Sequence, residues 1–190
     1  LELGQNPQLI SFCLFFRGLA YYRLGSAEGA AGQAAARFAA CADDLSALLE
    51  RNPTAEMRSV AYRTRGVALT RLGRSAEAVE NYRILIASAA TAAERTDFEL
   101  MLMELHFDLG ELAQTAEAAR QIIAADFEDD NAAGFFKKER AYLVLTSVLL
   151  EQEEYGQTVQ VAREAVARYP GSAELAALRL AIARALFAAG

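Results

Sequence analysis

The sequence is short of histidine and proline and has no tryptophan. It contains one histidine and three prolines among 190 residues. A Ser-His-Asp arrangement would have to be built around His106, which lies inside the apolar segment FELMLMELHFDLG, so we expect a packed or surface histidine there. Because proline costs about 3 kcal/mol inside a helix, three prolines placed between helical patterns favour helix nearly everywhere. The sequence therefore predicts an all-α protein that is not an enzyme.

Cysteine is also scarce, and both cysteines lie within helical patterns. Two residues, Cys13 and Cys41, are too few for a disulfide framework. We expect free thiols that behave as small buried hydrophobes. The alternative is a disulfide that joins the two helices of the first hairpin, so the redox compartment stays open.

The most acidic stretch does not carry a complete metal-binding pattern. The segment from Asp126 to Gly134, DFEDDNAAG, resembles the start of a calcium loop. Asn131 stands where that loop needs glycine, however, and Lys137 stands where it needs the closing glutamate. We therefore expect a solvated acidic loop, with no bound metal and no cofactor.

Long hydrophobic runs and an excess of positive charge are missing too. No apolar run approaches the roughly 20 residues that span a bilayer, and no secretory leader is recognisable, so we expect no membrane span in this chain. A net charge of -6 and a pI near 5.0 argue against nucleic acid as a partner. We expect a soluble globular protein, located in the cytoplasm, or in the periplasm if an upstream signal was removed.

A repeated pattern is the strongest positive feature of the sequence. Gly18 precedes Gly25 by seven residues in SFCLFFRGLAYYRLG, and Gly66 precedes Gly73 by seven in SVAYRTRGVALTRLG. Each copy predicts a helical hairpin, and such hairpins stack because none buries its apolar face alone. We expect one repeat domain over residues 1–190, with units at roughly 8–53, 59–92, 96–127 and 139–172 and a terminal helix at 173–189.

The spacing within the second unit identifies the family that the chain resembles. Tyr62, Gly66, Ala78 and Tyr82 match the pattern of the tetratricopeptide repeat (TPR), although Arg65 replaces its leucine. The resemblance implies a right-handed solenoid of about four TPR-like hairpins plus a C-terminal helix.

The third unit fits the pattern least well. Leu100, Met103, Phe107 and Ala116 match if Gly110 sits one residue early, and a register one residue lower fits almost as well.

The first unit and the two ends depart from a regular repeat. Gly25 and Pro53 are 28 residues apart where the family has about 17, and the excess is close to three helical turns. We therefore expect one long helix over residues 27–51, or a short helix joined to it near Gly29 or Gly32. Residues 1–3 resemble the tail of a repeat's second helix. The chain is therefore expected to be a fragment or processed form of a longer protein, or its last helix is a cap with a polar outer face.

The resemblance also implies where a partner binds. In the TPR fold the first helix of every hairpin lines a concave groove that receives an extended peptide or a partner's helix. Carried onto this sequence, the binding residues are Phe12, Phe15, Leu19, Tyr22, Arg63, Val67, Arg71, Met101, Leu105, Leu143, Ser147 and Leu150. This groove would be apolar with a basic middle, so we expect a partner segment that carries apolar and acidic residues.

Two alternatives stay open at this point. The aromatic residues of the first unit, Phe12 and Phe15 among them, either belong to the groove or pack in the core or against upstream helices. The expected function is that of a protein-protein interaction scaffold. The alternative is an accessory component of a bacterial envelope or transport system that binds a lipid or another small apolar ligand. Family members that grip a C-terminal carboxylate use paired Lys and Asn in the groove, and that pattern is missing here.

Overall fold

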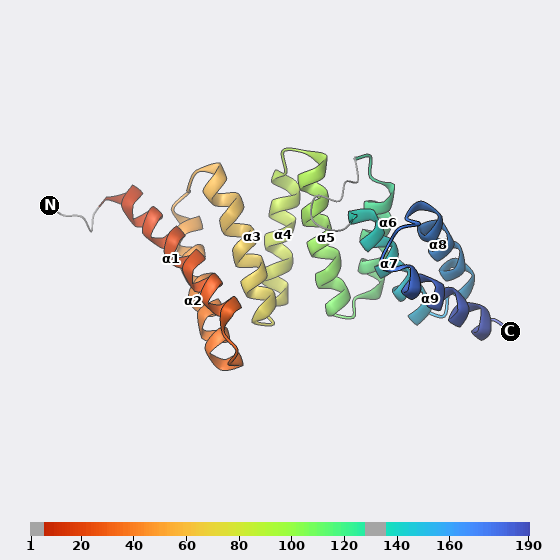
Figure 1. The fold of residues 1–190 in the computed structure, drawn as a ribbon. Helices are drawn as coiled ribbons and strands as arrows, with labels where there is room; N and C mark the ends of the chain where they lie inside the picture. Colours follow the sequence, from red (N-terminus) through yellow and green to blue (C-terminus); the bar gives the residue numbers. More distant parts are fainter. Residues whose placement is uncertain (1–5, 128–135) are drawn as a thin grey trace. The chain divides into compact units, whose positions relative to one another are not determined.

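The computed structural model describes residues 6–127 and 136–190, and these residues form helices and no strands. The expected all-α class is confirmed. In chain order (Figure 1) the helices are α1 (Pro7–Ala27), α2 (Ala31–Glu50), α3 (Ala55–Arg71), α4 (Ser75–Ser88), α5 (Ala92–Asp108), α6 (Leu112–Ala124), α7 (Lys137–Glu151), α8 (Tyr155–Arg168) and α9 (Leu175–Ala188). No helix among the described residues is long and apolar enough to cross a membrane.

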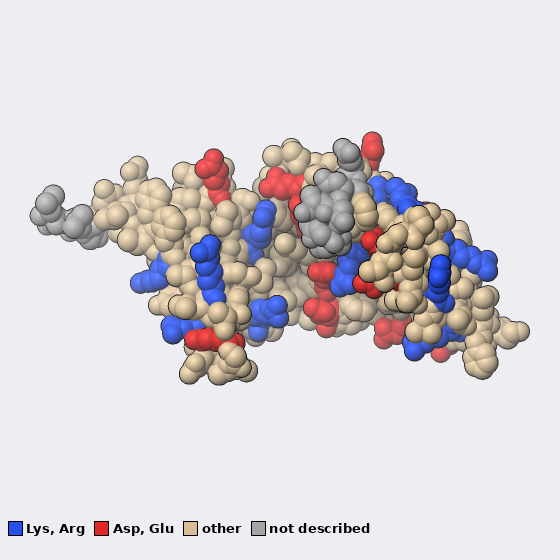
Figure 2. Space-filling view, in the orientation of Figure 1, with Lys and Arg blue, Asp and Glu red and all other residues tan. Residues whose placement is uncertain are grey.

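The chain divides into two compact units with different charge. Unit 1 spans Leu1–Ser88 and contains α1 to α4, and unit 2 spans Ala89–Gly190 and contains α5 to α9. Unit 1 has ten arginines and eight acidic residues, whereas unit 2 has nine basic and 17 acidic residues. Figure 2 shows mostly basic side chains on unit 1 and both signs on unit 2. That the two units form one continuous repeat domain stays a prediction.

Alternate helices pack against each other inside each unit. Besides the contacts between consecutive helices, α1 packs on α3 in unit 1, and α7 packs on both α5 and α9 in unit 2. The pairs α2 with α4 and α6 with α8 make no comparable contact. The odd-numbered helices are therefore closer together than the even-numbered ones, which places them on the inner side of each unit's curve.

The first hairpin is held close by glycine. Asn6 caps α1 by accepting hydrogen bonds from two backbone N–H groups, and Pro7 begins the helix. A Cβ atom at Gly18 would lie 2.8 Å from Leu45 Cδ2, and one at Gly25 would lie 3.1 Å from Arg37 Cβ. The expected long second helix is present as α2, and its 20 residues begin just after Gly29.

The turns after α3, α5 and α7 share one geometry, which determines the register of the third repeat. Gly73 and Gly110 both have φ of +70°, and Glu153 has φ of 62°. After α3, the backbone N–H of Arg74 donates to the carbonyl oxygen of Leu69 at 2.9 Å. After α5, the backbone N–H of Glu111 donates to the carbonyl oxygen of His106 at the same distance. His106 is therefore the equivalent of Leu69, and the register one residue lower than our first choice is correct.

His106 accordingly packs in unit 2 instead of reaching a partner. It is 8% exposed, and its Nδ1 lies 2.5 Å from Glu111 Oε2 in the turn that follows α5. This nitrogen therefore interacts within its own hairpin. In unit 1 the equivalent position is occupied by Leu69. Of the two possibilities expected for this residue, a packed or a surface histidine, the structure shows the packed one.

Other expectations about single residues have mixed outcomes. Both cysteines are free, and Cys41 is buried as expected, but Cys13 is exposed on α1. The alternative that the last helix is a cap with a polar outer face is wrong, since Leu180, Leu186 and Phe187 are exposed on α9. Residues 1–3 and most of the acidic segment 126–134 lie outside the described residues.

Candidate functional site

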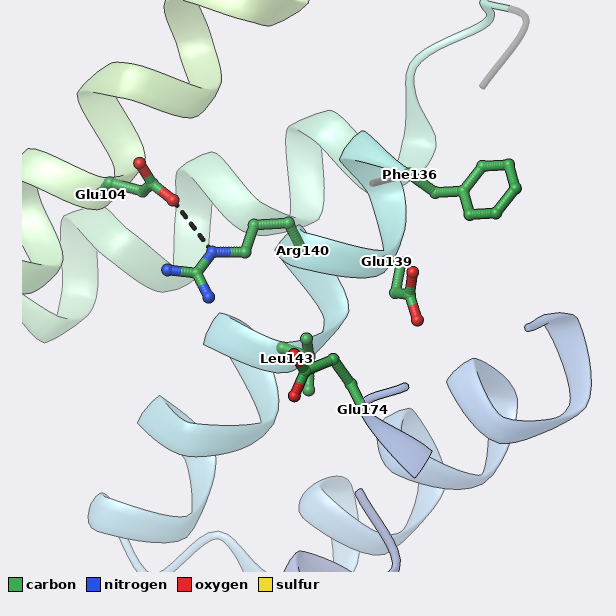
Figure 3. A pocket seen from close by; sticks show the side chains of 6 residues that line it. All are labelled: Glu104, Phe136, Glu139, Arg140, Leu143 and Glu174. Carbon is green, nitrogen blue, oxygen red and sulfur yellow. Dashed lines mark hydrogen bonds and ion pairs between the residues drawn. The ribbon is translucent and has the colours of Figure 1, made fainter. Parts of the chain in front are cut away.

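A pocket on the inner side of unit 2 is the best candidate for a binding site. It has a volume of about 310 Å³ and is formed by three odd-numbered helices, α5, α7 and the start of α9. The lining residues are Glu104, Phe136, Glu139, Arg140, Leu143 and Glu174, and we call this the α5–α7–α9 pocket (Figure 3).

Two ion pairs hold α5 against the first turn of α7 beside this pocket. Arg140 Nε donates to Glu104 Oε1 at 2.9 Å, and Lys137 Nζ lies 2.7 Å from Asp97 Oδ1. Asp97 and Glu104 are seven residues apart, so both face α7 from one side of α5. Leu143 supplies the apolar lining beside Glu174 (Figure 3), whereas Phe136, the N-cap of α7, has its ring 5.3 Å from that of Tyr169.

One carboxylate in the pocket is buried and has an unpaired oxygen. Glu139 is 8% exposed, and its Oε1 has no hydrogen-bond partner. Arg140 is the neighbouring cation in the lining, and its Nε is used by Glu104 (Figure 3). Burying a charged group without a partner is unfavourable, so Glu139 is the residue of this pocket whose environment most requires explanation.

The sequence-based choice of binding residues in unit 2 is partly corrected by the register. Leu105 is only 3% exposed and belongs to the core, so its assignment to a binding surface is wrong. In the observed register its place is taken by Glu104, which lines the pocket. Leu143 also lines the pocket, whereas Met101 and Leu150 are half-buried and Ser147 is exposed.

Of the expected binding residues of unit 1, only Phe12 lines a described pocket, which has a volume of about 410 Å³ and lies between the start of α1 and the turn before α3. Phe15 and Tyr22 are half-buried and pack against the core cluster of α2 and α3, which favours the core alternative for these two. Phe12 is 51% exposed, and its ring stacks on Phe16 at 6.4 Å. Leu19 is half-buried on α1.

The basic middle of the expected groove lies on α3. Arg63 and Arg71 are exposed, and Val67 between them is half-buried. The three residues therefore lie on a surface of α3, but none of them lines a described pocket. Their role in binding stays a prediction.

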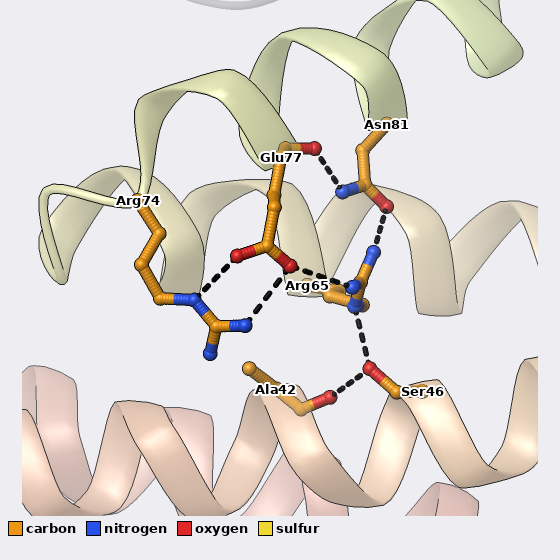
Figure 4. Close-up of polar contacts among 6 residues, drawn as sticks. All are labelled: Ala42, Ser46, Arg65, Arg74, Glu77 and Asn81. Carbon is orange, nitrogen blue, oxygen red and sulfur yellow. Dashed lines mark hydrogen bonds and ion pairs between the residues drawn. The ribbon is translucent and has the colours of Figure 1, made fainter.

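A cluster of polar and charged side chains around Arg65, also in unit 1, contributes to the packing of α2, α3 and α4. Arg65 donates to Ser46 Oγ at 2.7 Å, to Asn81 Oδ1 at 3.0 Å and to Glu77 Oε2 at 3.3 Å. Glu77 also pairs with Arg74 at 2.7 Å (Figure 4). These bonds join α2, α3 and α4, so the arginine that replaces the repeat's leucine links three helices. Its side chain is engaged inside the fold.

Five pocket residues were not among the sequence-based candidates: Glu104, Phe136, Glu139, Arg140 and Glu174. Glu104 was missed through the register, and Phe136 and Glu174 because they lie at helix starts. The sequence did contain one indication of the site: Glu139 and Arg140 are adjacent charged residues, on different sides of a helix that is otherwise largely apolar. Only the packing of α5 and α9 on α7 shows which of these charges meet.

Comparison with known proteins adds no family or relative. A scan against protein-family models finds no match to this chain, and a search of curated proteins finds no significant similarity. Among the residues that the structure describes, no group of three or more His, Cys, Asp or Glu side chains is arranged to hold a metal ion. The case for a function therefore depends on the geometry of the pocket.

Proposed function

We propose that this chain is a TPR-like helical scaffold that binds a segment of another protein along its odd-numbered helices. The scaffold would be a right-handed solenoid of about four hairpins with α9 as an additional helix. The observation that carries the proposal is the α5–α7–α9 pocket, because one site draws side chains from three alternate helices. A segment crossing these helices would contact each of them in turn.

The size and lining of the pocket suit a side chain of such a segment. Its volume of about 310 Å³ is near the lower end of ligand pockets, which span roughly 300–1,000 Å³. Phe136 and Leu143 offer apolar contact, and charged groups surround them. Interfaces commonly combine an apolar anchor with a polar rim in this way.

A lipid or another small apolar ligand has less support as the occupant. Three carboxylates and Arg140 line the pocket, and because Arg140 pairs with Glu104, an apolar ligand would leave the charges of Glu139 and Glu174 uncompensated. The accessory role in an envelope or transport system is therefore the second candidate, and no described feature favours it over protein binding.

Selection of peptide binders tests the proposal directly. Binders to the whole chain are isolated from a library of random peptides and then tested on two variants. Ser147→Tyr places a bulky side chain on the exposed inner side of α7, and the matched control Gln160→Tyr does the same at an exposed position of α8. We expect Ser147→Tyr to abolish the binding of most peptides and Gln160→Tyr to leave it intact. Equal binding to both variants would overturn the proposal.

A further inference from the structure

The charges of the α5–α7–α9 pocket are not balanced. Glu104 and Arg140 pair with each other at 2.9 Å, with side chains that are 43% and 48% exposed. Glu139 and Glu174 remain, and Arg140 is the only cation among the described residues that line the pocket. The two remaining carboxylates differ in environment, since Glu139 is buried on α7 and Glu174 is exposed at the start of α9.

Glu139 supplies an independent sign that this pocket favours a cationic group. Glu139 lines the pocket and is 8% exposed, and its Oε1 accepts no hydrogen bond. Buried carboxylates normally accept hydrogen bonds or pair with a cation. A cation that enters the pocket would compensate the charge of this carboxylate.

Building on the proposed scaffold function, we propose that the α5–α7–α9 pocket binds a lysine or arginine side chain of the partner segment. The cationic head would lie between Glu139 and Glu174, and the aliphatic stem would lie against Leu143, which stands beside Glu174 (Figure 3). Long cationic side chains combine such a stem and head. An acidic side chain is disfavoured here because Glu104 already neutralises Arg140.

This inference reverses the charge that the sequence alone suggests for the partner. Arg63 and Arg71 on α3 favour acidic groups, whereas the pocket in unit 2 favours a basic one. A metal ion is a poorer occupant than an ammonium or guanidinium group, because the described residues offer no cluster of three metal-binding side chains.

A titration with single-residue probes tests the chemistry of the pocket. The ¹⁵N-labelled chain is titrated with N-acetyl-lysine methylamide, and the norleucine analogue serves as a probe with the same stem and no charge. We expect the lysine probe to shift the amide signals of residues 136–143 and of Glu174, and to bind about tenfold more tightly than norleucine. Equal affinities, or no shift at the pocket, would overturn the inference.

Conservative variants separate the effect of charge from damage to the fold. Glu139→Gln should weaken the lysine probe about tenfold while the protein stays at least as stable, because the change removes a buried charge. Glu174→Gln is a second test at an exposed position, and Glu151→Gln at the end of α7 is the matched control. If Glu139→Gln and Glu174→Gln bind the lysine probe like the unmodified chain, the carboxylates do not hold the cation.

The peptide selection distinguishes this inference from the proposed function. Peptides that lose binding on Ser147→Tyr and are enriched in lysine or arginine support both. Peptides that lose binding on Ser147→Tyr and show no such enrichment support the scaffold and contradict the cation pocket. Peptides that are insensitive to Ser147→Tyr contradict the scaffold itself.

Discussion

Units 1 and 2 use different means to bring equivalent helices together. At the position where the first helix of a hairpin approaches its partner, unit 1 has Gly66, and unit 2 has Met103 and Thr146. A Cβ at Gly66 would lie 3.1 Å from two ring atoms of Tyr82. Unit 1 therefore achieves close packing by omitting a side chain, while unit 2 fills the same place with a side chain of ordinary size. The same repeat position thus tolerates substitution differently in the two units.

The units also differ in their charged residues. Unit 1 has a net charge of +2 and unit 2 a net charge of -8, as counted from the sequence. Unit 1 uses Arg65 inside the packing of three helices, and unit 2 keeps an unpaired buried oxygen on Glu139 at a pocket. Unit 1 also holds a buried carboxylate oxygen without a hydrogen-bond partner, Glu28 Oε2, but the other oxygen of Glu28 pairs with Arg37 at 3.5 Å, and no such ion pair is found for Glu139 among the described residues.

The largest expected effect tests the glycine in unit 1 against its equivalent in unit 2. Gly66→Leu should reduce the free energy of unfolding by about 2–3 kcal/mol, because the new side chain overlaps the ring of Tyr82. Met103→Leu conserves volume at the same repeat position and should cost under about 1.5 kcal/mol. Urea denaturation measures both, and amide exchange shows which unit loosens. Equal losses would mean that Gly66 does not lie in the close contact with Tyr82 described above.

The next effect concerns the arginine that joins α2, α3 and α4. Arg65→Leu should reduce the free energy of unfolding by about 1–3 kcal/mol, because Asn81, which is 1% exposed, loses its donor. Arg71→Leu on the same helix is the matched control and should change it by less than about 0.5 kcal/mol. Adding Asn81→Leu to Arg65→Leu should recover part of the loss. If Arg65→Leu behaves like the control, the network does not stabilise unit 1.

Alkaline pH should weaken unit 1 before unit 2. Burial raises the pKa of the Cys41 thiol from 9.0 to about 12, and the charge of Asp44 adds to this. Burial also raises the pKa of Tyr142 in unit 2 from 10.0 to about 12, with a further contribution from its hydrogen bond to Glu164. Each group stays protonated in the folded chain and ionises more readily in the unfolded chain. The stability that it contributes is therefore lost as the pH rises above its unfolded pKa.

Between pH 8 and pH 10 the loss from Cys41 should be about 1.4 kcal/mol, and it should be absent in Cys41→Ala. Denaturation at the two pH values, followed by amide exchange in each unit, measures this difference. The same pH slope in Cys41→Ala as in the unmodified chain would contradict the assignment.

The smallest expected effect uses the fact that both cysteines lie in unit 1. Cys13 is exposed and Cys41 is buried, so a thiol reagent should label one site in the folded chain and two sites in urea. Labelling of Cys13 should change the stability little. The rate at which Cys41 is labelled then reports the local unfolding of unit 1 alone. Rapid labelling of both thiols under native conditions would show that α2 is not packed as described.

Several features of the fold were predictable because they depend on local sequence. Helix is favoured by the scarcity of proline, and the break between α1 and α2 falls at Gly29. The turn after α3 requires a positive φ, which Gly73 provides, and the same argument holds for Gly110. The turn after α7 was harder to recognise because Glu153 adopts a positive φ without being glycine.

The binding site was only partly predictable, because it depends on contacts between distant residues. Leu143 was expected to face a groove, and it lines the pocket. Leu105 was placed there wrongly because a shift of one residue moves a side chain by about 100° around a helix. The same shift of one residue places Glu104 in the pocket, where it accepts a hydrogen bond from Arg140, a residue 36 positions later in the sequence.

The sequence by itself determined that this chain is helical and repetitive, and where its main turns lie. These properties follow from backbone preferences and from apolar spacing, which act over a few residues. The tertiary structure alone decided which charges are used in packing and which are left over. Arg65 is engaged because α2 and α4 present partners to it, and Glu139 has an unpaired oxygen because neither α5 nor α9 presents one. Whether a buried charge is satisfied depends on neighbours that local sequence does not specify.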